Sequence, residues 1–238
     1  MRTLFNTLLV EPFLNALVFI YEYITFEDLG FAIIVLTIII RFILYPLFYK
    51  SIKSQAMVQK IQPQITEIQK KYKTDKEKQA QELMRVYKEN NVNPFASIGY
   101  IFAQLPILWA VYAVFLKPFN EETFISLYSF IPQPEHISST FLQLIDLTKP
   151  NIIIVGVAVI VQYIHARLSL PRIKQQAQGQ AAKMAKYMVY AGPIIALIIL
   201  PNFSAAIGLY WATSSVFTIF QQIIINKQIY GTETTGKN

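Results

Sequence analysis

The chain of 238 residues has no cysteine, which excludes a disulfide framework, a thiolate metal site, a cysteine nucleophile and a lipidated cysteine. It also lacks a Walker-type glycine loop, the HExxH and GxSxG motifs, and any pair of carboxylates inside its apolar runs. These absences predict a protein that is not an enzyme and that uses no metal or cofactor. The first residues carry one arginine and no small-residue cleavage site before Glu11, so we expect neither a removable signal peptide nor a transit peptide.

Apolar residues make up 54% of the chain. Five apolar runs each approach the ~20 residues with which a helix crosses a bilayer about 30 Å thick. The sequence therefore predicts an all-α integral membrane protein with five transmembrane helices. These runs lie at 29–49, 94–116, 150–168, 184–200 and 205–226.

The net charge of +7 is concentrated between the apolar runs. Residues 50–93 carry ten Lys/Arg and five acids, and residues 167–186 carry five Lys/Arg and no acid. Residues 117–149 have two lysines and four acids, and residues 1–28 have one arginine and four acids. By the positive-inside rule, we expect the N-terminus outside and the C-terminus in the cytoplasm.

The segments outside the predicted spans have different characters. Residues 1–28 carry a polar stripe at helical spacing, which predicts an amphipathic helix in the outer interface with its main part starting at Glu11 and Pro12. A sixth span there would expose glutamates to lipid. We expect an outer loop, a cytoplasmic loop, an outer turn and a cytoplasmic tail at 117–149, 169–183, 201–204 and 227–238. The polar stripe comprises Thr3, Thr7, Glu11, Asn15 and Glu22.

Residues 50–93 form the one strongly hydrophilic block and predict a cytoplasmic helical hairpin. Pro63 should kink or divide its first helix. Thr74 and Glu77 match a capping box at the start of its second helix. Asn93 and Pro94 should end it.

Arg41 is the one charge within the run from residue 33 to 49, where it lies roughly 13 Å from Lys50 along a straight helix. A guanidinium keeps its charge, and insertion near mid-helix costs about 2.5–3.5 kcal/mol. One interpretation is an ion pair that holds the bundle together, but the five predicted spans contain no Asp or Glu. We therefore favour a wet cavity open to the cytoplasm, lined by Arg41 and by Thr37 one turn away.

The other polar and aromatic residues of the spans allow two interpretations. Gln104 and Gln162 suit interhelical hydrogen bonds as well as cavity lining. Trp211 is too deep for an aromatic belt, which leaves packing or cavity lining. His165, near the inner end of its span, suits an interfacial position.

Five segments carry a family resemblance: LGFAIIVLTIIIRFILYPL, SQAMVQKIQPQITEIQKKYK, LMRVYKENNVNPF, FAQLPILWAVY and GLYWATSSVFTIFQQIIINK. Their content and order resemble the YidC/Oxa1/Alb3 membrane protein insertases, of the short bacterial type without a large outer domain. The resemblance covers about residues 10–227. It implies five helices around a hydrophilic groove that is open to cytoplasm and lipid. It also implies that Arg41 is the groove arginine, that Thr37 and Trp211 face the substrate, and that Gln162 lines the groove.

The resemblance further implies a bacterial plasma membrane protein, active as a monomer, that receives nascent membrane proteins and releases their apolar segments into lipid without nucleotide hydrolysis. The ribosome, the signal recognition machinery and the Sec translocon are candidate partners. We assign partner binding to six residues of the predicted hairpin. They are Lys60, Gln62, Pro63, Lys70, Lys71 and Lys73.

Two other function classes stay open at this point. A small transporter or channel subunit would bind an anionic solute through Arg41, but it should show inverted repeats or paired broken helices. A pure assembly factor or chaperone for membrane proteins is the third candidate.

Overall fold

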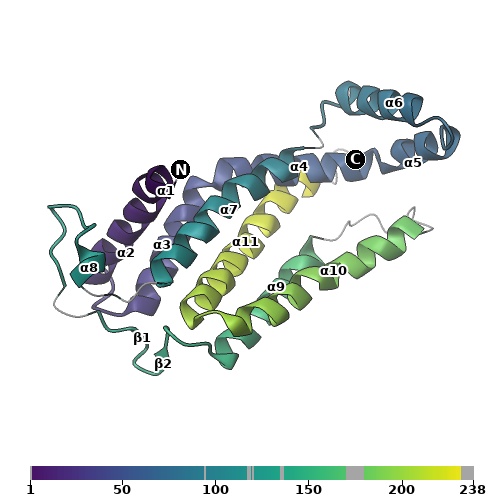
Figure 1. Cartoon of the computed structure of the whole chain (residues 1–238). Helices are drawn as coiled ribbons and strands as arrows, with labels where there is room; N and C mark the ends of the chain where they lie inside the picture. The colour runs from purple at the N-terminus through teal and green to yellow at the C-terminus, as the bar shows by residue number, and fades with distance from the viewer. Residues whose placement is uncertain are drawn as a thin grey trace.

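The computed structural model describes residues 2–93, 95–116, 119, 121–134, 137–169 and 180–231. Five of the described helices form a bundle, α2 (Glu11–Tyr23) and α4 (Tyr45–Lys60) pack against it, and the other elements lie toward its two ends (Figure 1). The five are α3 (Leu29–Ile43), α7 (Ala96–Phe115), α9 (Ile152–Leu168), α10 (Gln180–Ile199) and α11 (Ala205–Gly231). The other elements are α1 (Arg2–Phe5), η1 (Asn6–Val10), α2 (Glu11–Tyr23), α4 (Tyr45–Lys60), α5 (Gln62–Lys71), α6 (Lys76–Glu89), α8 (Glu121–Phe124), β1 (Thr140–Phe141), β2 (Ile145–Asp146) and η2 (Leu200–Asn202).

Taken singly, none of the described helices has both the length and the hydropathy that a membrane span requires. Helices α3 and the first part of α4 reach them together, as a pair bent by 61°. Shorter apolar helices occupy Phe102–Phe115, Ile152–Leu168 and Tyr190–Asn202. Parts of the predicted cytoplasmic loop and tail, residues 170–179 and 232–238, lie outside the described residues.

The predicted first span, 29–49, is not one straight helix. Helix α3 ends at Ile43, Leu44 forms its C-cap, and the chain turns by 61° into α4. Pro46, in the first turn of α4, has no N–H to donate and its ring crowds the carbonyl four residues earlier. The straight-helix depth for Arg41 therefore does not apply, and the bend begins within one turn of this residue.

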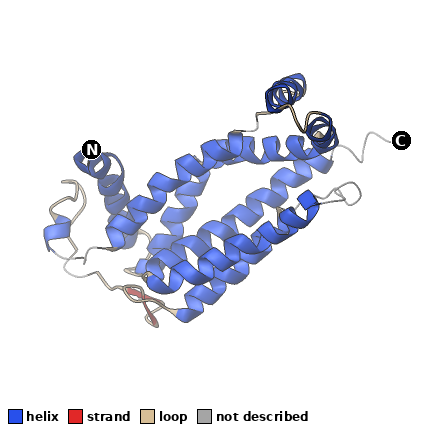
Figure 2. Cartoon of the chain, turned by 45° about the vertical axis from the view of Figure 1, so that its right-hand side comes forward, coloured by secondary structure: helices blue, strands red, loops and turns tan. Residues whose placement is uncertain are grey.

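Helices α5 and α6 form a hairpin at the end of the molecule opposite the β1–β2 strands (Figure 2). Pro63 lies in the first turn of α5, directly after the break at Ile61 that separates this helix from α4. The two helices share a small apolar core of Ile61, Ile65, Val86 and Val92. The predicted capping box was wrong, because Asp75 is the N-cap of α6 and its carboxylate accepts a hydrogen bond from Lys78 N–H. Pro94, expected to end the hairpin, lies outside the described residues.

Helix α2 packs onto the bundle through a buried face, and one residue of its predicted polar stripe belongs to that face. Asn15 is only 2% exposed. Its Nδ2 donates to the carbonyl of Ser126 over 3.0 Å, and its Oδ1 accepts from Tyr128 N–H over 2.6 Å. The polar stripe is therefore buried at Asn15, where the backbone of the outer loop supplies its hydrogen-bond partners.

Two more polar contacts attach the outer loop to the bundle. Tyr21 Oη accepts from Ser138 N–H at 2.9 Å, and the Asp28 carboxylate accepts from Leu142 N–H at 2.8 Å. Asp28 also caps α3 through Phe31 N–H. These bonds hold the loop between α7 and α9 against the last turn of α2 and the start of α3.

One close helix contact in the bundle depends on glycine. A Cβ on Gly208 of α11 would lie 2.8 Å from the Ile154 side chain of α9. The absence of a side chain at Gly208 therefore lets the two helices pack closely at this position. The shared core around them contains Val155, Ala158 and Ala206. Small residues thus bring α9 and α11 together along the wall that carries the candidate site.

Asn15→Ala should lower the free energy of unfolding in detergent micelles by about 1 kcal/mol, because it removes the part-buried hydrogen bonds of the Asn15 amide to the backbone of Ser126 and Tyr128. Denaturant titration followed by circular dichroism measures this. Thr7→Ala is the matched control, since the Thr7 hydroxyl makes only an exposed 3.5 Å contact with Glu11. Equal loss in both variants would contradict the assigned role.

Candidate functional site

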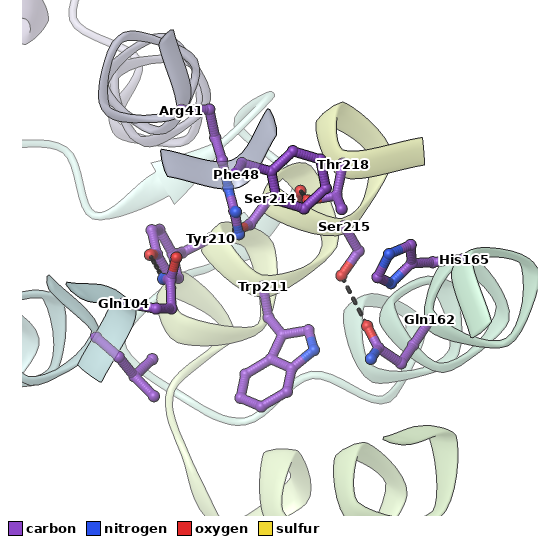
Figure 3. A pocket seen from close by; sticks show the side chains of 11 residues that line it. Arg41, Phe48, Gln104, Gln162, His165, Tyr210, Trp211, Ser214, Ser215 and Thr218 are labelled. Carbon is purple, nitrogen blue, oxygen red and sulfur yellow. Dashed lines mark hydrogen bonds between the residues drawn. The ribbon is translucent and has the colours of Figure 1, made fainter. Parts of the chain in front are cut away.

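A cavity of about 210 Å³ lies among α3, α4, α7, α9 and α11 (Figure 3). Its wall combines one arginine, two amides, four hydroxyl-bearing residues of α11 and several rings. The lining residues are Arg41, Phe48, Gln104, Leu108, Gln162, His165, Tyr210, Trp211, Ser214, Ser215 and Thr218. Five segments separated in sequence thus converge on one polar space inside an apolar bundle.

Arg41 reaches this cavity from the last turn of α3 and is 8% exposed. Its guanidinium donates a hydrogen bond to Ser214 Oγ of α11. The predicted spans contain no carboxylate, so this cation is buried among hydroxyls, amides and rings. A buried charge held by neutral dipoles needs further solvation, which a polar cavity supplies when water fills it.

The two glutamines both line the cavity and bond across helices. Gln162 Oε1 of α9 accepts from Ser215 Oγ at 2.9 Å, and Gln104 Nε2 of α7 donates to Tyr210 Oη at 2.6 Å. Figure 3 shows these pairs on opposite sides of Trp211. The two interpretations that the sequence left open are therefore compatible, and each amide holds α11 to a neighbouring helix.

Thr37 differs from the other predicted groove residues. It is 2% exposed, and its hydroxyl donates to the carbonyl of Ile33 in its own helix at 2.6 Å. It is absent from the cavity lining. The expected wall of Arg41 with Thr37 one turn away does not form in this structure, because Thr37 is buried one turn earlier in α3 than the part of the helix that lines the cavity.

Some cavity residues carried no sequence signal of their own. Phe48 enters because the bend at Leu44 folds α4 over the cavity, and hydropathy does not reveal a bend. Tyr210 and Ser215 were indistinguishable from helix-packing residues before the facing helices were placed. His165, expected at the inner interface, lies in the cavity wall instead. The proline in YPLFY was the one available signal for the bend.

All six predicted partner-binding residues are exposed and lie away from the cavity. Lys60 ends α4, while Gln62 and Pro63 begin α5. Lys70, Lys71 and Lys73 lie at the other end of α5, where Lys71 Nζ is 5.4 Å from the centre of the Tyr72 ring. The structure thus separates a basic hairpin from the polar cavity.

The described residues include no group of three or more His, Cys, Asp or Glu side chains that could hold a metal ion. The cavity likewise contributes no carboxylate, so its chemistry is hydrogen bonding and positive charge.

Comparison with known proteins places this chain among bacterial membrane proteins. The family model described as "60Kd inner membrane protein" matches residues 19–233. The chain is 37% identical to "Membrane protein insertase YidC" of Clostridium tetani over 93% of both chains, and 33% identical to "Membrane protein insertase YidC 2" of Bacillus anthracis over 93% of this chain and 81% of that protein. It is 29% identical to the protein of that name from Geobacter metallireducens, of which it spans 38%.

Ser214→Ala should lower the free energy of unfolding by about 1.5–3 kcal/mol, the usual contribution of a hydrogen bond to a charged group. The loss should largely disappear in an Arg41→Met background, since the charge is then gone. Denaturant titrations of the four proteins of this double-mutant cycle measure the coupling. Thr213→Ala, a neighbour outside the cavity lining, is the control; an undiminished Ser214→Ala effect without Arg41 would contradict the pairing.

Proposed function

Because the chain belongs to the 60Kd inner membrane protein family, we propose that it is a bacterial inner-membrane protein insertase that receives nascent membrane proteins in the Arg41 cavity. Members of this family are insertases and chaperones rather than enzymes, in line with the missing catalytic motifs. The observation that carries the proposal is a buried guanidinium, hydrogen-bonded to Ser214, that lines a polar cavity in an otherwise apolar bundle.

We propose that α3, α7, α9, α10 and α11 are the five spans, with the N-terminus outside and the C-terminus in the cytoplasm. The charge pattern supports this orientation, because the basic α5–α6 hairpin then lies inside and the acidic loop of β1 and β2 lies outside. Helix α9, with 17 residues, measures roughly 25 Å and is shorter than a ~30 Å hydrocarbon core. Such mismatch favours local thinning of the bilayer next to the cavity.

In this mechanism the cavity opens toward the cytoplasm and lipid and holds water around Arg41. A short polar segment of a nascent chain enters it and replaces that water, so its polar groups avoid the full cost of entering hydrocarbon. Positive charge favours acidic segments. The adjoining apolar segment then moves along the exposed faces of the bundle into lipid.

Hydrophobic transfer supplies the driving force in this proposal. Each square ångström of apolar surface removed from water contributes about 25 cal/mol, so a whole transmembrane segment releases ample free energy. Nucleotide hydrolysis is unnecessary on this account. The six exposed residues of the basic hairpin remain our candidates for contacts with the ribosome, the signal recognition machinery or the Sec translocon, and the insertase would act as a monomer.

A transporter of an anionic solute is the alternative that Arg41 also supports. The basic hairpin and the polar residues of α11 favour insertion, because they all belong to the half of the molecule proposed as cytoplasmic.

Arg41→Ala should reduce insertion of substrates with acidic outer tails several-fold more than insertion of neutral-tailed ones, because the attractive charge is lost. Arg41→Lys should retain most activity if charge rather than guanidinium geometry matters. Protease protection of substrates inserted into reconstituted vesicles measures both. Lys227→Ala, an exposed cation of α11 outside the cavity, is the control. Equal loss for both substrate classes would exclude an electrostatic role.

A photo-crosslinking residue at Trp211 or Gln104 should capture ribosome-bound nascent membrane proteins, because both positions line the cavity. The same residue at Ile198, exposed on α10 away from it, is the control. Crosslinks from Thr37 should be weak, since that side chain is buried. Solute flux without nascent-chain crosslinks would favour the transporter instead.

A further inference from the structure

Three large apolar side chains point outward at the end of the molecule that carries β1 and β2. Phe26 is 98% exposed and Leu144 is 84% exposed, and Leu142 is exposed beside it. We call Phe26, Leu142 and Leu144 the outer rim. These three side chains neither line the cavity nor belong to the apolar core.

The rim comes from two turns that the fold holds together. The Asp28 carboxylate, two residues after Phe26, accepts from Leu142 N–H in the β1–β2 turn, and the Phe31 and Phe141 rings pack edge to face at 5.4 Å. At the other side of the hairpin, the Lys149 carbonyl accepts from Ala205 N–H at 2.8 Å. The β1–β2 hairpin therefore lies beside the first residues of α3 and α11 (Figure 1).

The backbone of these turns does not require apolar side chains. Phe26 and Leu142 have φ values of 52° and 53°, in the left-handed region where glycine or asparagine is accommodated most easily. The turn is closed by backbone bonds such as Leu144 N–H to the Phe141 carbonyl. Bulky apolar groups at these strained, exposed positions disfavour the free turn in water, so a contact outside the chain explains them better.

Lipid fits the size and the surroundings of the rim better than a protein partner does. A stable protein interface buries about 800 Å² on each side, far more than three side chains on narrow turns offer. The exposed side chains of Ile152 and Ile153 continue the apolar surface into the first turn of α9. Shortly after Leu144 in the sequence, Asp146 and Lys149 form an exposed ion pair at 2.8 Å, as expected for a part of the surface that contacts water.

We propose that the outer rim inserts into the outer leaflet, at the boundary between headgroups and acyl chains, and anchors the outer loop there. The inference rests on the membrane orientation of the proposed function. Through Asp28 and Lys149, this anchor fixes the depth of the first turns of α3 and α11. The outer loop would then stay against the bilayer while the cytoplasmic end moves.

The experiment uses the absence of native cysteine. A nitroxide label on Leu144→Cys, in the full chain reconstituted at low density into phosphatidylglycerol–phosphatidylethanolamine vesicles, is compared for collisions with oxygen and with a water-soluble nickel chelate. Leu144 is exposed and lies outside the left-handed positions, so the variant should fold. We expect a several-fold higher oxygen-to-nickel ratio than for Gln133→Cys, an exposed polar position of the same loop.

Ile160→Cys, exposed midway along α9, separates this proposal from the proposed function. A lipid signal at Ile160 with a water signal at Leu144 would overturn the anchor and leave the spans intact. Water signals at both would overturn both. Protection of Leu144 from both reagents would show a protein occupant, such as a second copy, and would also overturn the anchor.

Discussion

The whole architecture must accommodate one cation that cannot lose its charge. Arg41 is buried, and the helices around it bring no carboxylate, so its solvation comes from Ser214 and from the polar walls of the cavity. Neutral dipoles solvate a guanidinium only partly, so a polar space has to remain open beside it.

The surrounding helices keep that space open without losing cohesion. Gly208 allows α9 and α11 to approach closely on the outer side of the cavity, while the Gln162–Ser215 and Gln104–Tyr210 bonds hold α11 to both neighbours at cavity level. The bend after Arg41 then carries α4 and Phe48 over the opening. The close packing of α9 and α11 at Gly208 and the two hydrogen bonds made by the glutamines therefore define the cavity.

Each predicted apolar run falls on a described helix or, at 29–49, on the bent pair of α3 and α4, because apolar runs are local patterns. Sequence reasoning also identified Arg41, Gln104, Gln162 and Trp211, which all line the cavity. It missed Phe48, whose position depends on a bend of 61° at a proline, and it placed Thr37 in the wall although its hydroxyl is satisfied within its own helix. The burial of Asn15 was missed for a similar reason, since its partners lie 111 and 113 residues away. Such errors concern which face of a helix meets which neighbour, and that information is not local.

Helix α11 contributes to both the apolar core and the polar cavity. Its first turns bury Ala205, Ala206 and Leu209 in the apolar core, whereas the buried positions further along include Thr218, Gln221 and Gln222. Within the described part of the chain, both amide atoms of Gln221 and the Oε1 of Gln222 have no hydrogen-bond partner. Buried amides without partners cost about 1–3 kcal/mol each, a penalty that water or a peptide backbone removes. The polarity of the cavity thus extends along α11 toward the basic hairpin, the side on which the proposed function puts the arriving nascent chain.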